Sequence, residues 1–463
     1  MKYPSLFAYI KKNDIFFISL FPIVLWFLFF GNKLIYEPYV WDDLHFFRNY
    51  SNSELFSTWV GNWDPDNIET VSYRPLAIWY YHLQSIVFGE NTFLLSIFVY
   101  VTQLVLIFVI LSFFKKLNFS NGQLFFLFTI LIFSKIFTTI VTWKTLNPLV
   151  FCYINFFLAS IYYLKWIDNG KFKNIIFLIF FSFICIFSRE ELYHLPFYLF
   201  FLGLLYIKNF SFDEIKRIII ASLIVLSVVV LHYFLRSNFL SGASEIKITI
   251  SGIKGVLLSG VASGLPGGLI TTNVIEITLQ LIWVLSLLIL FFIYCKRNYR
   301  DLFQVKKFLM LFIIICILTS PSMIIIRDFG IFLPSVFVYA IIALIFANIL
   351  NYLIEKKFSK KLIMVIFSIS FISGIIGGFY RSIDHVNVWK HNSLYNLSND
   401  SVWIYGYTQD EVTIPSVRRE FKKNQLKEYG ISEKLNYDEL ISKINNNLTK
   451  KEIIIPRHFP LKY

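Results

Sequence analysis

The sequence contains few charged side chains for its length. Asp, Glu, Lys and Arg together make up 16% of its 463 residues, whereas 57% of the residues are hydrophobic and 53 are phenylalanine. The mean hydropathy is +0.63. This composition excludes an ordinary soluble globular protein and indicates a chain that lies in a lipid bilayer.

Cysteine and metal-binding motifs are also scarce. The four cysteines, Cys152, Cys185, Cys295 and Cys316, all lie within apolar runs or at the end of one. Because there is no CxxC pair, no HExxH motif and no cluster of Cys and His, the sequence favours neither a disulfide framework nor a zinc site.

No internal repeat and no linker rich in proline or serine divides the chain. We therefore expect a membrane domain over residues 1–380 and a C-terminal tail over residues 381–463. The tail contains two runs typical of strands, VWIYGYT and EIIIP, and a charged stretch around residues 418–434 that is typical of a helix.

The apolar residues form about 11 runs (range roughly 10–13) that suit transmembrane helices, because crossing ~30 Å of hydrocarbon takes about 17 to 25 residues. The predicted fold class is therefore an all-α polytopic membrane protein. The runs lie at residues 15–31, 92–114, 122–142, 149–164, 175–187, 192–207, 218–235, 277–295, 308–326, 331–351 and 362–379.

Lysine and arginine fall mainly in alternate loops, which predicts the orientation of the chain. Cationic loops face the cytoplasm, so we expect a cytoplasmic N-terminus, with an outer side that carries the first long loop and the C-terminal tail. We interpret the net charge of +14 as this signal, facing anionic lipid, and not as a nucleic-acid-binding surface. The cationic loops contain Lys2, Lys11, Lys12, Lys115, Lys116, Lys165, Lys171, Lys173, Lys208, Lys216, Arg217, Lys296, Arg297, Arg300, Lys306, Lys307, Lys356, Lys357, Lys360 and Lys361.

The first outer loop, residues 32–91, contains a predicted interfacial helix. The span before this loop starts with basic residues but is followed by no cleavage site, so we expect it to remain as an anchor. Residues 72–89 have apolar side chains at helical spacing, with Pro75 near the start, where proline is tolerated. We expect Trp79, Tyr80 and Tyr81 to lie at the level of the lipid headgroups.

Two adjacent carboxylates, Asp42 and Asp43, follow the first span in the stretch VWDDLHFF. Neighbouring carboxylates that titrate together either raise the pKa of one of them or bind a cation. Such a pair suits a general base. A structural alternative is that Asp42 caps the helix LHFFRNY and Asp43 adds a charge to its first turn. His45 lies three residues after Asp42.

Further ionisable residues are expected on the same side. Arg74 precedes the interfacial helix, and Arg189, Glu190 and Glu191 lie between two short spans. Ionisable residues at membrane depth are costly and usually face a cavity or a partner. The alternative is that Arg189 simply pairs with one glutamate at the membrane surface.

Arg327 follows an apolar run, and its planar fork suits a phosphate. The alternative is that Arg327 reaches toward lipid headgroups. Lys135 lies within an apolar run and is expected to face the bundle interior, because a lone cation there costs about 2.5–3.5 kcal/mol. His82, His194 and His232 are expected to be core or interface residues rather than metal ligands.

Five segments in this order resemble the multi-spanning GT-C glycosyltransferases. They are WDD (41–43), SYRPL (72–76), REE (189–191), RDFGIFLPS (327–335) and RSIDHVNVWKHNSLY (381–395). The likeness is greatest to the membrane part of the protein O-mannosyltransferase and tetratricopeptide-containing O-mannosyltransferase group. It covers about residues 15–395, and the tail carries no tetratricopeptide pattern.

The resemblance implies that a hexosyl or pentosyl group is transferred, with inversion, from a polyprenyl-phosphate-linked donor to a glycan, lipid or protein acceptor outside the membrane. By this likeness Asp42 would take the acceptor proton and Asp43 would orient the site. The remaining roles would be phosphate binding by Arg74 and Arg327, and substrate binding by Glu190, Glu191 and His45.

Whether Mg²⁺ or Mn²⁺ bridges the aspartates and a glutamate stays open at this point. Two other functions also stay open: a polymerase or ligase of lipid-linked glycans, and a membrane transporter or flippase. The second of these would be expected to show inverted repeats and broken helices.

Overall fold

The computed structural model describes a set of helices and four short strands. The described residues are 22–24, 26–28, 46–47, 49–61, 73–89, 91–134, 144–207, 210–240, 274–297, 302–319, 332–355, 361–376, 403–405, 412–413, 434–435 and 453–455. Asp42, Asp43, His45, Lys135 and Arg327 lie outside them.

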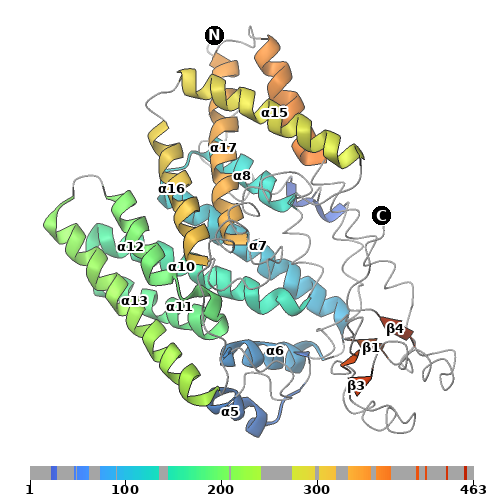
Figure 1. Ribbon diagram of the computed structural model, residues 1–463, viewed down its shortest axis with the longest axis vertical. Coiled ribbons are helices and arrows are strands. Elements are labelled where there is room, and N and C mark those ends of the chain that lie inside the picture. The colour runs from blue at the N-terminus through green and yellow to red at the C-terminus, as the bar shows by residue number, and fades with distance from the viewer. Residues whose placement is uncertain are drawn as a thin grey trace.

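Helices make up nearly all of the described chain, which confirms the predicted helical class (Figure 1). They are α5 (Asn52–Val60), α6 (Pro75–Phe88), α7 (Thr92–Lys116), α8 (Asn121–Ile132), η2 (Lys144–Leu146), α10 (Asn147–Asn169), α11 (Phe172–Ser188), η3 (Glu190–Leu192), α12 (Leu195–Tyr206), α13 (Phe212–Phe239), α15 (Val274–Arg297), α16 (Leu302–Thr319) and α17 (Phe332–Glu355). A further helix spans Lys361–Ile376.

The described strands lie in the tail. β1 (Trp403–Tyr405) pairs in parallel with β4 (Ile453–Ile455), and both fall within the two runs predicted as strands. β2 (Val412–Thr413) pairs antiparallel with β3 (Lys434–Leu435). Lys434 therefore lies in a strand, although the sequence predicted the end of a helix there; the rest of that stretch is outside the described residues.

Five described helices are long and apolar enough to cross a membrane. They are Phe93–Lys116, Lys144–Asn169, Phe212–Phe239, Thr278–Lys296 and Phe332–Glu355. The apolar helices Asn121–Ile132, Phe172–Ser188 and Lys361–Ile376 are shorter. A helix of 12 residues, such as α8, rises only about 18 Å. The chain is thus a helical membrane protein, but eleven separate spans are not confirmed.

Local sequence explains where several helices begin and end. Ser51, Ser120 and Ser211 form capping boxes with the glutamate or glutamine three residues later, at the starts of α5, α8 and α13, which satisfies two backbone N–H groups at each start. Pro75 occupies the first position of α6, where the missing N–H costs nothing. Gly170 ends α10 in the left-handed conformation, with φ of 61°.

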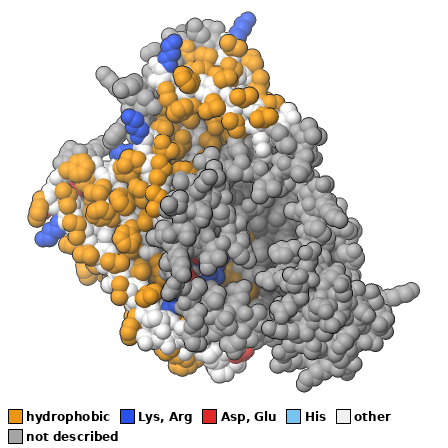
Figure 2. Space-filling model, in the orientation of Figure 1, with side chains coloured by type: hydrophobic (Ala, Val, Ile, Leu, Met, Phe, Trp, Pro, Cys, Tyr) orange, Lys and Arg blue, Asp and Glu red, His pale blue; other side chains and the backbone are white. Residues whose placement is uncertain are grey.

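The helices pack around α10, which contacts α7, α11, α12 and α13, while α17 packs against α8 and α16. Phenylalanine fills this core; Phe114, for example, contacts the rings of Phe119, Phe308 and Phe337. The outer surface of the helices is also apolar, and Figure 2 shows hydrophobic side chains covering most of the described surface on one face. An apolar exterior of this extent fits contact with lipid.

Polar contacts join the described helix ends in two groups. At one end, Asp168 of α10 pairs with Lys116 of α7 and accepts a hydrogen bond from Tyr206 of α12. There Arg217 of α13 also donates to the carbonyl of Ile167 at 2.8 Å. The end of α11 and the end of α13 meet the start of α6 elsewhere, at the network described below.

The predicted interfacial helix is α6, but its aromatic residues are not all directed to lipid headgroups. Tyr81 is buried and donates a hydrogen bond to the carbonyl of Thr145 at 2.6 Å. Tyr80 stacks on Phe151, with ring centroids 4.7 Å apart. Tyr81 is enclosed because α6 packs against α10 and α11. The level of α6 relative to the lipid headgroups stays a prediction.

Candidate functional site

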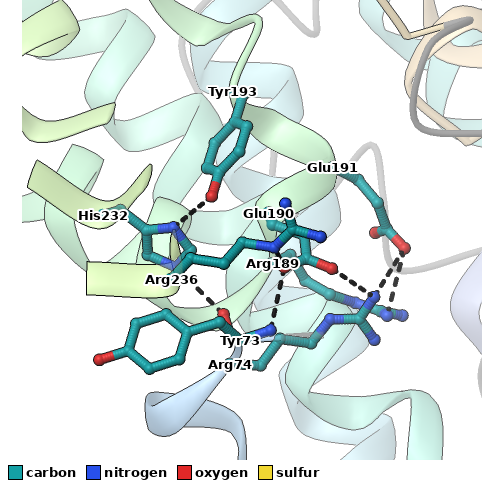
Figure 3. A network of polar contacts seen from close by, with 8 residues as sticks. All are labelled: Tyr73, Arg74, Arg189, Glu190, Glu191, Tyr193, His232 and Arg236. Carbon is teal, nitrogen blue, oxygen red and sulfur yellow. Dashed lines mark hydrogen bonds and ion pairs between the residues drawn. The ribbon is translucent and has the colours of Figure 1, made fainter. Parts of the chain in front are cut away.

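A network of charged and polar side chains lies where three segments meet (Figure 3). Tyr73 and Arg74 immediately precede α6, and Arg189, Glu190 and Glu191 follow α11. His232 and Arg236 lie one helical turn apart near the end of α13, so their side chains project from the same face of that helix. Segments 117 residues apart in sequence are in direct contact here.

Glu190 holds the three segments together. Its Oε2 accepts the backbone N–H of Tyr73 at 3.0 Å and lies 3.4 Å from Nε of Arg236. Its Oε1 lies 3.7 Å from Nη2 of Arg74. The side chain is only 16% exposed. Because both oxygens are already engaged, Glu190 positions the arginines and the start of α6.

Glu191 bridges two arginines. Its Oε1 lies 3.3 Å from Nη2 of Arg74 and 3.4 Å from Nη1 of Arg189. Burial of Arg189 disfavours its charged form and is the largest single influence on its pKa. Glu191, together with smaller contributions from Tyr81, Tyr153 and Cys152, outweighs burial and holds the pKa of Arg189 above its usual value. Arg189 therefore remains a cation in the network.

His232 connects the network to the backbone of Tyr73. Its Nε2 donates to the carbonyl oxygen of Tyr73 at 3.0 Å, and a carbonyl can only accept. The proton therefore lies on Nε2, and Nδ1 accepts the hydroxyl proton of Tyr193 at 2.5 Å. The Tyr73 ring contacts the His232 ring edge-on at 5.1 Å, and burial raises the pKa of Tyr73 to about 12. The tyrosine thus stays neutral.

The described network carries three guanidinium groups and two carboxylates, a net charge of +1. Arginines that are largely removed from water need a nearby negative charge. The planar guanidinium group can donate two parallel hydrogen bonds either to a carboxylate or to a phosphate. The chemistry that this arrangement suits is therefore the binding of an anion such as a phosphate.

The structure brings together some of the residues predicted for the site. Arg74, Glu190 and Glu191 are in contact through the ion pairs above. The other predicted site residues, Asp42, Asp43, His45 and Arg327, lie outside the described residues. Arg189 pairs with one glutamate, Glu191, as the structural alternative expected, and Glu191 is shared with Arg74.

Sequence reasoning missed Arg236 and the linking role of His232. The signal was the spacing of His232 and Arg236, which are four residues apart in an otherwise apolar stretch of α13. Two polar residues at this spacing share one helix face. His232 and His194 are both buried, as expected for core histidines.

A metal site is not formed by the described side chains alone. Among the residues that the structure describes, no group of three or more His, Cys, Asp or Glu is arranged to hold a metal ion. Glu190 does not fit as a metal ligand, because its oxygens face arginines and a backbone N–H. Whether Mg²⁺ or Mn²⁺ binds at Asp42 and Asp43 stays open, because both lie outside the described residues.

The fold and the network define a class: a helical integral membrane protein with a largely buried arginine–glutamate network at one group of helix ends. No protein-family model matches the chain, and no curated protein matches it.

Proposed function

We propose that this protein is an integral-membrane glycosyltransferase of the GT-C type. It transfers a sugar from a polyprenyl-phosphate-linked donor to a glycan, lipid or protein acceptor. The reaction takes place on the outer face, with the N-terminus in the cytoplasm. The observation that supports this proposal is the contact of Arg74 with Glu190 and Glu191, because two of the segments that resemble the family meet there.

A lipid-linked donor would account for a charged network at the ends of apolar helices. A polyprenyl chain is accommodated among apolar helices, whereas its phosphate needs cations at the helix ends. Arg74 would hold this phosphate together with Arg327, and their positive charge would stabilise the negative charge that develops on the leaving phosphate. Arg189 and Arg236 add to the positive charge of the described network.

The proposed base comes from the chain segment just before Phe46. Phe46 stacks on Tyr81 of α6, with ring centroids 5.1 Å apart, and Tyr81 is one of the groups that act on the pKa of Arg189. Asp43 is three residues from Phe46, and three residues reach at most about 10 Å. Asp42 and Asp43 lie outside the described residues, so their position beside α6 is part of the proposal.

In the proposed reaction the acceptor hydroxyl oxygen attacks the anomeric carbon of the donor sugar. A new carbon–oxygen bond forms as the bond between that carbon and the phosphate oxygen breaks. Asp42 takes the hydroxyl proton, and polyprenyl phosphate leaves with the bonding electron pair. One displacement inverts the configuration at the anomeric carbon. Asp43 orients the acceptor, and Glu191 and His45 contact substrate hydroxyl groups.

The test is mass spectrometry of cell-envelope glycans from a deletion strain complemented with wild type, Asp42→Asn or Asp213→Asn at equal membrane abundance. Asp213 is an exposed carboxylate in the first turn of α13, at the end opposite Arg236, and serves as the control. We expect deletion and Asp42→Asn to lose the same sugar, while Asp213→Asn restores it. Restoration by Asp42→Asn would overturn the assignment of the base.

An unchanged glycan profile in the deletion strain would overturn the glycosyltransferase proposal itself. A flippase would give a different result, because its deletion would leave the lipid-linked sugar intact but on the cytoplasmic side of the membrane. Accessibility of that lipid to a membrane-impermeant oxidant in intact cells distinguishes the two.

A further inference from the structure

One oxygen of Glu191 occupies a position that a phosphate oxygen would also favour. Oε1 lies between Nη2 of Arg74, at 3.3 Å, and Nη1 of Arg189, at 3.4 Å. Figure 3 shows the two arginine side chains converging on this carboxylate. Arginine forks bind carboxylate and phosphate oxygens by the same charge-assisted contacts. The two anions therefore compete for one place.

Glu190 and Glu191 differ in how firmly each carboxylate is held. The Glu190 side chain is 16% exposed and accepts a backbone N–H as well as contacting two arginines. The Glu191 side chain is 35% exposed. The backbone of Glu191 is fixed separately, because its carbonyl accepts the Nδ1–H of His194 at 2.9 Å. The Glu191 carboxylate is thus the more exposed of the two, and the hydrogen bond of its backbone does not involve the carboxylate.

When no ligand is bound, a carboxylate in this position stabilises the two neighbouring arginines. Two neighbouring guanidinium groups that are 14% and 12% exposed repel each other and have lost much of their hydration. Leaving such charges without an anion is strongly unfavourable. Glu191 offsets this cost in the unliganded protein, and an incoming anion must replace it.

We infer that Glu191 is an exchangeable counter-ion. In the unliganded protein its carboxylate occupies the position between Arg74 and Arg189 that an oxygen of a phosphate monoester takes when ligand is bound. The proposed exchange is argued from the contacts of Glu191 with the two arginines, whereas the identification of the ligand as a polyprenyl phosphate rests on the proposed function.

The experiment compares phosphate binding by the full chain in lipid nanodiscs, using isothermal titration calorimetry. The probes are inorganic phosphate and a short-chain isoprenyl monophosphate, which separate a free phosphate from a lipid phosphate. The variants are Glu191→Gln, which removes the charge, and Glu191→Asp, which keeps the charge but is one methylene shorter. Asp213→Asn removes a negative charge at the far end of α13 and is the control.

We expect both Glu191 variants to bind the isoprenyl phosphate about two- to fivefold more tightly than wild type, because each weakens a partly exposed ion pair that competes with the ligand. The control should bind as wild type does. Tighter binding by Glu191→Gln alone would indicate a general effect of charge. It would overturn the proposal that the Glu191 carboxylate and the phosphate exchange places. Unchanged affinity in both variants would also overturn it.

A parallel assay of sugar transfer separates this inference from the proposed function. Binding and transfer by wild type, with unchanged affinities in both variants, overturn only the exchange. Tighter phosphate binding in both variants, without sugar transfer by wild type, supports the exchange and overturns the glycosyltransferase proposal. Absence of binding of both probes to every variant overturns both.

Discussion

Nε2 of His232 donates a hydrogen bond to the backbone carbonyl of Tyr73, 159 residues earlier in the chain, at 3.0 Å. This bond ties α13 to the residue that precedes Arg74. The hydroxyl of Tyr193 donates to Nδ1 of the same ring, which fixes the tautomer. His232 thereby sets the backbone position from which Arg74 reaches Glu190 and Glu191.

His232→Phe should lower the free energy of unfolding by about 1–3 kcal/mol, because it leaves a buried carbonyl and a buried hydroxyl without this partner. Phenylalanine retains the aromatic contact with Phe187, whose ring lies edge-on at 4.7 Å. Tyr193→Phe is the matched variant: it removes one hydrogen bond and should cost about 0.5–1.5 kcal/mol. Chemical unfolding in detergent measures both, and equal stability of His232→Phe and wild type would contradict this role.

His82 should make the contact between α6 and the segment just before α5 sensitive to acid. The backbone N–H of Tyr50 donates to Nδ1 of His82 at 3.1 Å, so Nδ1 must carry no proton. Burial lowers the pKa of His82 below its usual value, and Glu54 opposes this shift only in part. The unfolded chain therefore binds a proton that the folded chain does not, and stability falls as the pH drops below about 6.5.

Hydrogen–deuterium exchange of peptides that contain Tyr50 checks this expectation. After correction for intrinsic rates, exchange should be faster near pH 5 than near pH 7.5, within the range where an ordinary histidine titrates. His82→Asn is the control, because its side-chain oxygen can accept from Tyr50 but cannot titrate. A pH effect that persists in His82→Asn would assign the sensitivity to another group.

Gly203 permits the close packing of α12 against α10 and α13. A Cβ at this position would collide with the hydroxyl of Tyr163 and lie 2.8 Å from Cγ1 of Ile218. Small residues allow helices to approach closely in membrane proteins. Gly203→Ala should therefore lower the unfolding free energy by about 1–3 kcal/mol, measured by thermal unfolding in detergent.

The double variant Gly203→Ala with Tyr163→Phe tests the cause of that loss. Removal of the hydroxyl relieves one of the two collisions, so alanine should cost less in the Tyr163→Phe background than in wild type. An equal cost in both backgrounds would show that the hydroxyl is not the obstacle.

Local features of the fold could be predicted from sequence, but their lengths and contacts could not. Pro75 correctly indicated the start of α6, and the motif Ser51–Glu54, which was not recognised, marks the start of α5. The apolar run at 122–142 predicted one span, yet α8 ends at Ile132. Hydropathy reports which solvent a residue prefers and does not report where backbone hydrogen bonds stop.

The candidate site shows the same division between local and long-range information. The cost of ionisable residues near the membrane singled out Glu190 and Glu191, and the place of Arg74 ahead of the interfacial helix, in the SYRPL segment, singled out Arg74. The structure brings these three into contact. No local pattern could pair Glu190 with the backbone N–H of Tyr73, 117 residues away. Arg236 was missed because a single arginine near the end of an apolar helix is commonly interpreted as an interface residue.

Arg74 gives the most direct test of the proposed chemistry. If Arg74 holds the leaving phosphate, Arg74→Gln should lower kcat by roughly 10²- to 10³-fold, the usual loss when one group that stabilises developing charge is removed. Arg74→Lys keeps the charge but loses the planar fork that contacts both Glu190 and Glu191, so it should be intermediate. The measurement is transfer of a labelled sugar from a short-chain polyprenyl-phosphate donor by protein in proteoliposomes.

Arg217→Gln is the matched control for this test, because Arg217 lies at the opposite group of helix ends and donates only to backbone there in the contacts described above. It should leave kcat unchanged at equal amounts of folded protein. A loss of kcat in Arg74→Gln but not in Arg217→Gln would then be specific to position 74 and not a general effect of removing an arginine from a helix end. A kcat for folded Arg74→Gln equal to that of wild type would mean that Arg74 is a structural partner of the two glutamates and that the phosphate is bound elsewhere.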